Sequence, residues 1–156
     1  MPGAHELVHA TAIALGGRAA LIRGASGAGK SDLALRCLSA GTSALVPLEA
    51  SLVADDQVCL ARTPAGRITA SAPATIEGQL EVRGLGIVAV PAAGPADLVL
   101  VVDLVSQSEV ERYPITASTA TLLGVELPLL RLSPFEASAH AKLLLALYLP
   151  RSLRDP

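Results

Sequence analysis

The chain has 156 residues, of which 51% are hydrophobic, and its 12 Lys and Arg residues against 14 Asp and Glu residues give a net charge of -2. This composition excludes a disordered chain. It also has too few basic and aromatic residues to form the kind of face that nucleic-acid binding needs. Because only two Tyr and one Phe are present, we expect a core of Leu, Val, Ile and Ala, in a single domain that spans residues 1–156.

The N-terminal segment has no positive charge ahead of its apolar stretch, and charged or Pro-rich segments interrupt every apolar run before about 18 residues. We therefore expect no signal peptide and no membrane span. Cys37 and Cys59 have no second Cys or His at metal-binding spacing. We expect both to be buried, reduced thiols in a cytoplasmic protein.

The first predicted elements are two short strands, residues 10–15 and 19–23, which Gly16 and Gly17 join as a hairpin. The second strand continues directly into a glycine-rich loop. Apolar residues then recur at helical spacing over residues 30–40, and Gly41 stands where a helix commonly ends. The pattern therefore predicts a strand, a glycine loop and a helix in succession.

The middle of the chain is predicted to be mostly sheet. Residues 51–62 alternate between apolar and polar positions in the way of one strand. Four more short extended segments, separated by Gly or Pro, lie within residues 66–73, 78–84, 86–92 and 97–105. Together with the helices, these segments predict an α/β sandwich with a sheet content above average.

A second helix is predicted near the C-terminus. Ser133 stands at the N-cap, Pro134 at the first helical position and Glu136 three residues after the cap, which together form a capping box. The pattern predicts a helix of roughly 14 residues that ends at Pro150.

Residues 24–31, GASGAGKS, fit the phosphate-loop pattern G-x-x-x-x-G-K-[ST] in its expected context between a strand and a helix. The glycines are expected to adopt positive φ angles that turn backbone N–H groups toward phosphate oxygens. Lys30 would supply a charge for the β- and γ-phosphates, and the Ser31 hydroxyl would complete a Mg²⁺ shell. The predicted nucleotide-binding residues are Gly24, Ala25, Ser26, Gly27, Ala28, Gly29, Lys30 and Ser31. The alternative is a glycine-rich turn that caps an ordinary helix.

A phosphate loop usually works with a carboxylate at the end of a neighbouring strand, and two candidates exist. Asp103 follows a purely apolar run, whereas Asp55 and Asp56 form an adjacent pair. In such a pair one carboxylate can serve the metal while the other, its pKa raised by the like charge beside it, takes a proton. The alternatives are a turn-capping Asp103 and a solvated acidic turn, and the spacing leaves the choice open.

The order of His9, GASGAGKS, LVADD and LEVRGLGIV (residues 80–88) resembles the catalytic domain of HPr kinase/phosphorylase. The chain is most similar to the short alphaproteobacterial form, which lacks the family's separate N-terminal domain. The resemblance implies a P-loop-containing mixed sheet flanked by helices, akin to the nucleotide-binding core of phosphoenolpyruvate carboxykinase. It also implies ATP and Mg²⁺ as cofactors.

The resemblance also implies roles for individual residues. His9, which lies 22 residues before Ser31, matches an active-site histidine that assists the acidic pair. Asp55 matches the base or acid that handles the serine proton, and Asp56 matches the second carboxylate. Glu81 matches a Mg²⁺ ligand that acts together with Ser31. Without the resemblance, His9 would be taken for a structural histidine and Glu81 for an exposed strand residue.

Three further residues belong to the signature: Arg83, Gly84 and Gly86, whose glycines would let the backbone approach substrate or metal closely. Arg112 falls where the family has an arginine in a mobile loop that affects phosphoryl transfer. The sequence departs from the family in that loop, at residues 111–114, and by an insertion at residues 42–51 that precedes Asp55.

The expected function is an ATP-dependent protein-serine kinase that phosphorylates an HPr-type phosphocarrier protein of the phosphotransferase system and that could also dephosphorylate it by phosphorolysis. The resemblance suggests a homo-hexamer, and neither nucleic acid nor membrane is an expected partner. The alternatives are a small-molecule kinase and a non-catalytic, nucleotide-sensing regulator. The kinase expectation requires Asp55 to lie within about 10 Å of the glycine loop or on a segment mobile enough to reach it.

Overall fold

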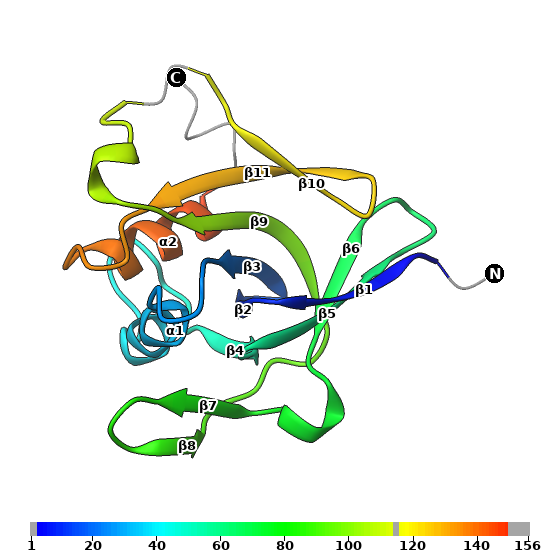
Figure 1. The fold of residues 1–156 in the computed structure, drawn as a ribbon, viewed down its shortest axis with the longest axis horizontal. Helices are drawn as coiled ribbons and strands as arrows, with labels where there is room; N and C mark the ends of the chain where they lie inside the picture. The colour runs from blue at the N-terminus through cyan, green and yellow to red at the C-terminus, as the bar shows by residue number, and fades with distance from the viewer. Residues whose placement is uncertain (1–2, 114–115, 150–156) are drawn as a thin grey trace.

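The structure, a computed structural model, describes residues 3–113 and 116–149. Among these residues, nine strands form one sheet, two strands form a separate hairpin, and two α-helices lie together at one side of the sheet (Figure 1). The fold is therefore a mixed α/β arrangement with a central sheet and helices, as predicted.

The main path of the sheet runs β1 (His5–His9), β5 (Gln57–Arg62), β6 (Ile68–Ser71), β9 (Ala96–Leu104), β3 (Arg18–Arg23), β2 (Thr11–Leu15) and β4 (Ser51–Ala54). Beyond this path, β11 (Val125–Leu132) pairs with β9, and β10 (Thr119–Leu122) pairs with β11. Strand β9 is parallel to β3 and to β11, whereas the other pairs are antiparallel. The continuous apolar run of β9 is explained by these parallel neighbours, because such strands are buried on both faces.

The separate hairpin consists of β7 (Gln79–Val82) and β8 (Gly86–Ala89), which lie below β4 in Figure 1. Two short 3-10 helices, Ala74–Ile76 and Gln107–Glu109, occupy connections. The hairpin contacts the body of the molecule through α1 (Lys30–Ser39) and β4, and Leu80 of β7 is fully buried. This contact places the exposed turn of the hairpin beside the start of α1.

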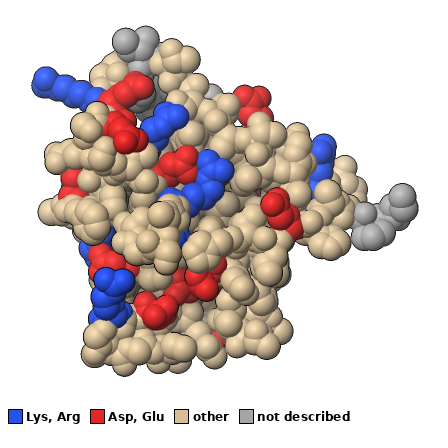
Figure 2. Space-filling view, viewed as in Figure 1, with Lys and Arg blue, Asp and Glu red and all other residues tan. Residues whose placement is uncertain are grey.

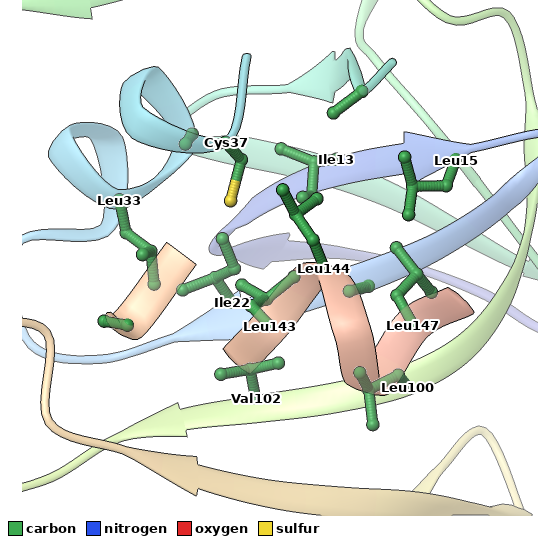
Figure 3. Packing of buried hydrophobic residues seen from close by; sticks show 14 of the residues in the cluster. Ile13, Leu15, Ile22, Leu33, Cys37, Leu100, Val102, Leu143, Leu144 and Leu147 are labelled. Atoms are coloured by element: carbon green, nitrogen blue, oxygen red, sulfur yellow. The ribbon is translucent and has the colours of Figure 1, made fainter. Parts of the chain in front are cut away.

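The larger core lies between the sheet and its helices, α1 and α2 (Ala139–Tyr148). Figure 3 shows three leucines of α2 packed against side chains of β2, β3 and β9, namely Leu143, Leu144 and Leu147 against Ile13, Ile22, Leu100 and Val102. A second cluster fills the opposite side of the sheet. Within the described residues the buried hydrophobic set contains no aromatic side chain, which confirms the predicted aliphatic core.

Two element predictions were wrong. Residues 51–62 form two strands rather than one, because the chain turns at Asp55 and Asp56, where Asp56 has a φ of 67°. The predicted capping box does not form either. Helix α2 begins at Ala139, and residues 133–138 form turns, with the Glu136 carboxylate 2.6 Å from Lys142 Nζ. Pro150, the predicted helix stop, lies outside the described residues.

Three strands went unpredicted: β1, β10 and β11. The predicted strands of the N-terminal hairpin, the helix after the glycine loop and the four extended segments all have counterparts in the structure. The inserted segment, residues 42–51, contributes Val46 and Ala50 to the core. Among the described residues, no helix is long and apolar enough to cross a membrane.

The two cysteines differ in burial. Both are free thiols; Cys37 is buried on α1, as predicted, whereas Cys59 on β5 is partly exposed. Burial raises the pKa of the Cys37 thiol to about 12, because desolvation penalises the thiolate.

Candidate active site

The glycine loop connects the end of β3 to the start of α1. Gly27 and Gly29 have φ angles of 81° and 101°, so both need the conformational freedom that was predicted for them. Gly24 does not, because its φ lies outside the left-handed region. A Cβ at Gly24 would lie 3.1 Å from the Ala28 Cβ, so this glycine is needed for close packing instead.

Lys30 is the first residue of α1 and is only 7% exposed. Its ammonium nitrogen Nζ donates to the main-chain oxygens of Gly24, at 2.7 Å, and Ala25, at 3.0 Å. The lysine therefore lies inside the loop, with its charge directed along the backbone that would surround a phosphate. These carbonyls compensate a buried ammonium that would otherwise be costly.

Asp55 follows β4 and lies in direct contact with the loop. Its Oδ1 accepts hydrogen bonds from the Ser31 hydroxyl, at 2.7 Å, and from the Thr11 hydroxyl, at 2.9 Å. Its Oδ2 accepts from the Glu81 backbone N–H at 3.0 Å. Asp55 is 5% exposed, so three donors from three different segments hold a buried carboxylate at the start of α1.

Asp56, the second member of the acidic pair, lies in a different environment. It is exposed, and its Oδ1 lies 3.2 Å from His9 Nδ1. The Asp56 main-chain oxygen also accepts from the Ala10 N–H, at 3.2 Å. The pair of carboxylates is therefore divided into one buried and one exposed group, with His9 beside the exposed one.

The signature residues lie on the β7–β8 hairpin. Glu81 lies near the end of β7, and Arg83 follows the strand. Gly84 and Gly86 have φ angles of 91° and 99°. A Cβ on either glycine would meet nothing within 4 Å, so the turn requires their backbone conformation rather than their small size. No ion pair joins Glu81 to Arg83 within the described residues, which leaves both side chains free to face the cleft.

These segments enclose a cleft of about 630 Å³. It is lined by His9, Thr11, Ser26, Gly27, Gly29, Lys30, Ser31, Asp32, Leu35, Asp56, Glu81, Val82, Arg83 and Phe135. Figure 2 shows acidic side chains gathered over the region between β4 and the β7–β8 hairpin, with basic side chains beside them. A smaller cleft of about 290 Å³ adjoins the first, since Asp56 and Glu81 line both, and Asp55 lines the smaller one.

Asp103, the other carboxylate candidate, is engaged elsewhere. Its two oxygens accept from Arg23 Nε, at 2.7 Å, and Arg23 Nη2, at 3.0 Å, as a bidentate pair at the ends of β9 and β3. The hydrogen bond to Asp103 raises the pKa of the Arg23 guanidinium above its ordinary value. Asp103 lines neither cleft, whereas Asp55 lines the smaller one and accepts a hydrogen bond from Ser31 of the glycine loop, so the geometry favours Asp55.

Arg112 is not brought to the cleft. It lies in an exposed bend after the second 3-10 helix and is not among the cleft-lining residues. The neighbouring Pro114, which belongs to the same predicted mobile loop, lies outside the described residues. The role of Arg112 stays a prediction.

The model of the family described as HPr Serine kinase C-terminal domain matches residues 3–147. The chain belongs to this family. Among curated relatives, the HPr kinase/phosphorylase of Bordetella pertussis is 37% identical over 128 residues, which cover 76% of this chain and 39% of that protein. The Brevibacillus brevis HPr kinase/phosphorylase is 32% identical over 133 residues, covering 79% and 40%. The chain thus spans about two fifths of the length of these relatives.

A solved structure of the HPr(Ser) kinase/phosphatase from Coxiella burnetii has the same fold. It superposes with a TM-score of 0.74 and covers 90% of this chain and 93% of that chain, at 21% sequence identity. At this identity the likeness concerns the fold alone. It confirms that the mixed sheet with its helices is the architecture of an HPr kinase family member.

Five residues that line the larger cleft were not among the predicted site residues, namely Thr11, Asp32, Leu35, Val82 and Phe135. Thr11 is a fully buried hydroxyl that binds Asp55, and its only signal was a polar residue within the apolar strand that follows His9. Phe135 is 81% exposed at the cleft. The sequence could have indicated it, because the only Phe of the chain stands in the polar segment SPFEAS and not in an apolar run.

Proposed function

We propose that this chain is the catalytic part of an ATP-dependent protein-serine kinase that phosphorylates an HPr-type phosphocarrier protein of the phosphotransferase system. One observation carries the proposal: the buried Asp55 carboxylate is hydrogen-bonded to the Ser31 hydroxyl of the glycine loop. A proton acceptor and a phosphate-binding loop are therefore in contact, as a transfer of a phosphoryl group to a hydroxyl requires.

The glycine loop would hold the phosphates. The main-chain N–H groups of the first turn of α1 have no partner within the helix, and the helix dipole adds positive potential there. Gly27 and Gly29 allow the loop to curve around an anion, and Lys30 adds a full charge beneath it. Catalysis by such a site is mainly positioning and neutralisation of charge.

The residues present also fit Mg²⁺. The Ser31 hydroxyl, the Glu81 side chain and Asp56 line one cleft, and oxygen atoms are the ligands that Mg²⁺ prefers. In the described residues, no group of three or more His, Cys, Asp or Glu side chains could hold a metal by itself. Mg²⁺ commonly takes only one or two protein ligands and completes its shell with phosphates and water. When bound, it would neutralise charge on the β- and γ-phosphates.

Asp55 would accept the proton of the acceptor hydroxyl. A carboxylate offers about four lone-pair sites. Oδ1 accepts two hydrogen bonds and Oδ2 accepts one, so the remaining site is on Oδ2. Asp55 lines the smaller cleft, which also includes Ile76 and Ile87. We propose that the serine of the carrier protein enters there, opposite the nucleotide in the larger cleft.

His9 and Asp56 would assist this transfer from the edge of both clefts. Their 3.2 Å contact places a titratable ring beside an exposed carboxylate that lines the larger and the smaller cleft. A histidine so placed can pass a proton to or from solvent. In the reverse direction, phosphate would attack phosphoserine. The bond to the serine oxygen would break, a pyrophosphate bond would form, and the proton of the attacking phosphate would pass through Asp55 to serine.

Further proposals follow from the family. We propose that residues 1–156 act as one catalytic domain whose sheet is akin to the nucleotide-binding core of phosphoenolpyruvate carboxykinase, which the family match over residues 3–147 supports. A homo-hexamer in the cytoplasm is the proposed assembly and location. Sedimentation of the purified protein would test the hexamer.

The decisive experiment is transfer of label from γ-labelled ATP, in the presence of Mg²⁺, to an HPr-type carrier and to a set of candidate metabolites. Label on a carrier serine supports the proposal. Label on a metabolite would indicate a small-molecule kinase instead. ATP that is bound but never consumed would indicate a nucleotide-sensing regulator, and absence of binding would remove the nucleotide function altogether.

Replacing the proton acceptor tests the mechanism. Asp55→Asn should retain nucleotide binding yet reduce phosphoryl transfer by roughly 100-fold or more, because the amide cannot take the hydroxyl proton. Asp103→Asn is the matched control, since Asp103 lies near the end of another strand, β9, and lines neither cleft. Near-normal transfer by Asp55→Asn would remove Asp55 from its proposed role.

A further inference from the structure

The only Phe of the chain lies at the cleft instead of in the core. Phe135 is 81% exposed, although the described core contains aliphatic side chains throughout. Its ring atom Cε1 would lie 3.8 Å from a Cβ placed on Gly29, so the ring stands next to the glycine loop. An exposed aromatic ring of this size loses the stabilisation that burial would give it.

The turn that carries Phe135 is tied to α1 on both sides of the ring. The Arg36 guanidinium donates through Nη2 to the Pro134 oxygen and through Nη1 to the Glu136 oxygen, at 3.2 Å. Arg36 is itself held by Asp32 at 3.1 Å. Since the glycine loop continues directly into α1, the ring keeps a fixed position relative to the loop.

The composition of the cleft suits a nucleotide rather than a phosphate chain alone. Leu35 and Val82 line it together with Phe135, so apolar surface accompanies the charged and hydroxyl groups near Lys30. Its volume of about 630 Å³ falls in the range of clefts that hold small organic ligands. Leu35 lies four residues along α1 from Ser31, about 6 Å of helix beyond the phosphate cradle.

We infer that Phe135 is the platform on which the base of the bound nucleoside triphosphate stacks. The inference rests on the proposed function, because it assumes that the glycine loop holds the phosphates of that nucleotide. Stacking on a flat ring accepts any base and favours the larger purines. The chain should therefore bind ATP and GTP with similar affinity, and both more tightly than tripolyphosphate, which has no base.

Calorimetric titration with ATP and with tripolyphosphate tests the inference. Phe135→Leu should weaken ATP binding about 10-fold and leave tripolyphosphate binding within about 2-fold, because only the stacking contact is lost. Phe135→Tyr should keep both affinities. Tyr113→Leu is the matched control, because Tyr113 is an exposed aromatic residue that does not line the cleft.

Fluorescence gives a second readout, since the chain contains no Trp. Phe135→Trp would carry a single indole, which ATP should quench and tripolyphosphate should not. Tyr113→Trp should respond to neither ligand.

The failures of the two proposals can be told apart. Equal weakening of ATP and tripolyphosphate by Phe135→Leu, or no weakening of either, overturns the stacking role while the phosphate cradle stands. Equal affinity of the wild-type protein for ATP and tripolyphosphate would also overturn the stacking role. A variant that raises only the KM for the carrier protein would assign Phe135 to the protein substrate and overturn the inference. Wild-type protein that binds neither ligand overturns both proposals.

Discussion

At the scale of single residues, the candidate site is organised around one buried carboxylate. Asp55 receives the hydroxyls of Thr11 and Ser31 and the backbone N–H of Glu81, and each donor comes from a different part of the chain. The arrangement leaves little freedom for the carboxylate to rotate. The donors therefore position the proton acceptor as much as they stabilise its charge.

Thr11 should be a positioning residue for Asp55. Thr11→Val preserves shape but removes one donor to a buried carboxylate, so it should lower the free energy of unfolding by about 1–3 kcal/mol. It should also reduce phosphoryl transfer roughly 10-fold through misplacement of Asp55. Urea unfolding and initial rates would measure the two effects.

Two variants control for this prediction. Thr11→Ser keeps the hydroxyl and should restore most of the transfer rate. Thr121→Val makes the same change at an exposed position of β10 and should alter neither quantity. A Thr11→Val protein with unchanged rate and stability would show that Ser31 and Glu81 suffice to hold Asp55.

At the scale of elements, local sequence patterns predicted the structure correctly wherever a segment's own residues determine its conformation. The β2–β3 hairpin and α1 followed from glycine positions and apolar spacing alone. The turn at Asp55 and Asp56 was missed, although three consecutive polar residues, Asp55, Asp56 and Gln57, interrupt the alternation of residues 51–62 there. The capping box failed because Arg36, which is distant in sequence, binds the main-chain oxygens of Pro134 and Glu136, while Lys142 of α2 binds the Glu136 carboxylate. These contacts hold residues 133–138 in turns.

Helix α2 should depend on its buried leucines. Leu143→Ala should lower the free energy of unfolding by about 2–5 kcal/mol, because the side chain is fully buried between α2 and the sheet and its loss leaves a cavity. Leu45→Ala, the same change at a side chain that is 67% exposed, should cost less than about 0.5 kcal/mol. Similar losses for the two variants would mean that α2 is not packed as in Figure 3.

At the scale of the whole molecule, the sheet brings together segments that the sequence keeps apart. The loop after β3, the turn after β4 and the β7–β8 hairpin converge because β2 lies between β3 and β4, while α1 contacts β7. No pattern within one segment contains this information. The choice between Asp55 and Asp103 therefore stayed open until the family resemblance and then the fold were considered.

The stability of the molecule should fall in alkaline solution. The pKa of Cys37 rises from 9.0 to about 12 on burial, so between these values the folded state keeps a proton that the unfolded state has lost. The contribution is complete below pH 9 and decreases by about 1 kcal/mol for each pH unit up to 12. Urea unfolding of wild type and Cys37→Ala from pH 8 to 10.5 should show the steeper decline in wild type. Cys59→Ala, at a partly exposed thiol, should decline like wild type.

The internal bonds of Lys30 have a consequence for ion selectivity. Its ammonium already has two carbonyl partners, so an anion that displaces them must be a stronger hydrogen-bond acceptor than a main-chain oxygen. Chloride is a weak acceptor, whereas a phosphate oxygen carries charge, and the third N–H of the ammonium remains available to it. A chain of linked phosphates presents several such oxygens at once, which favours it over a single small anion.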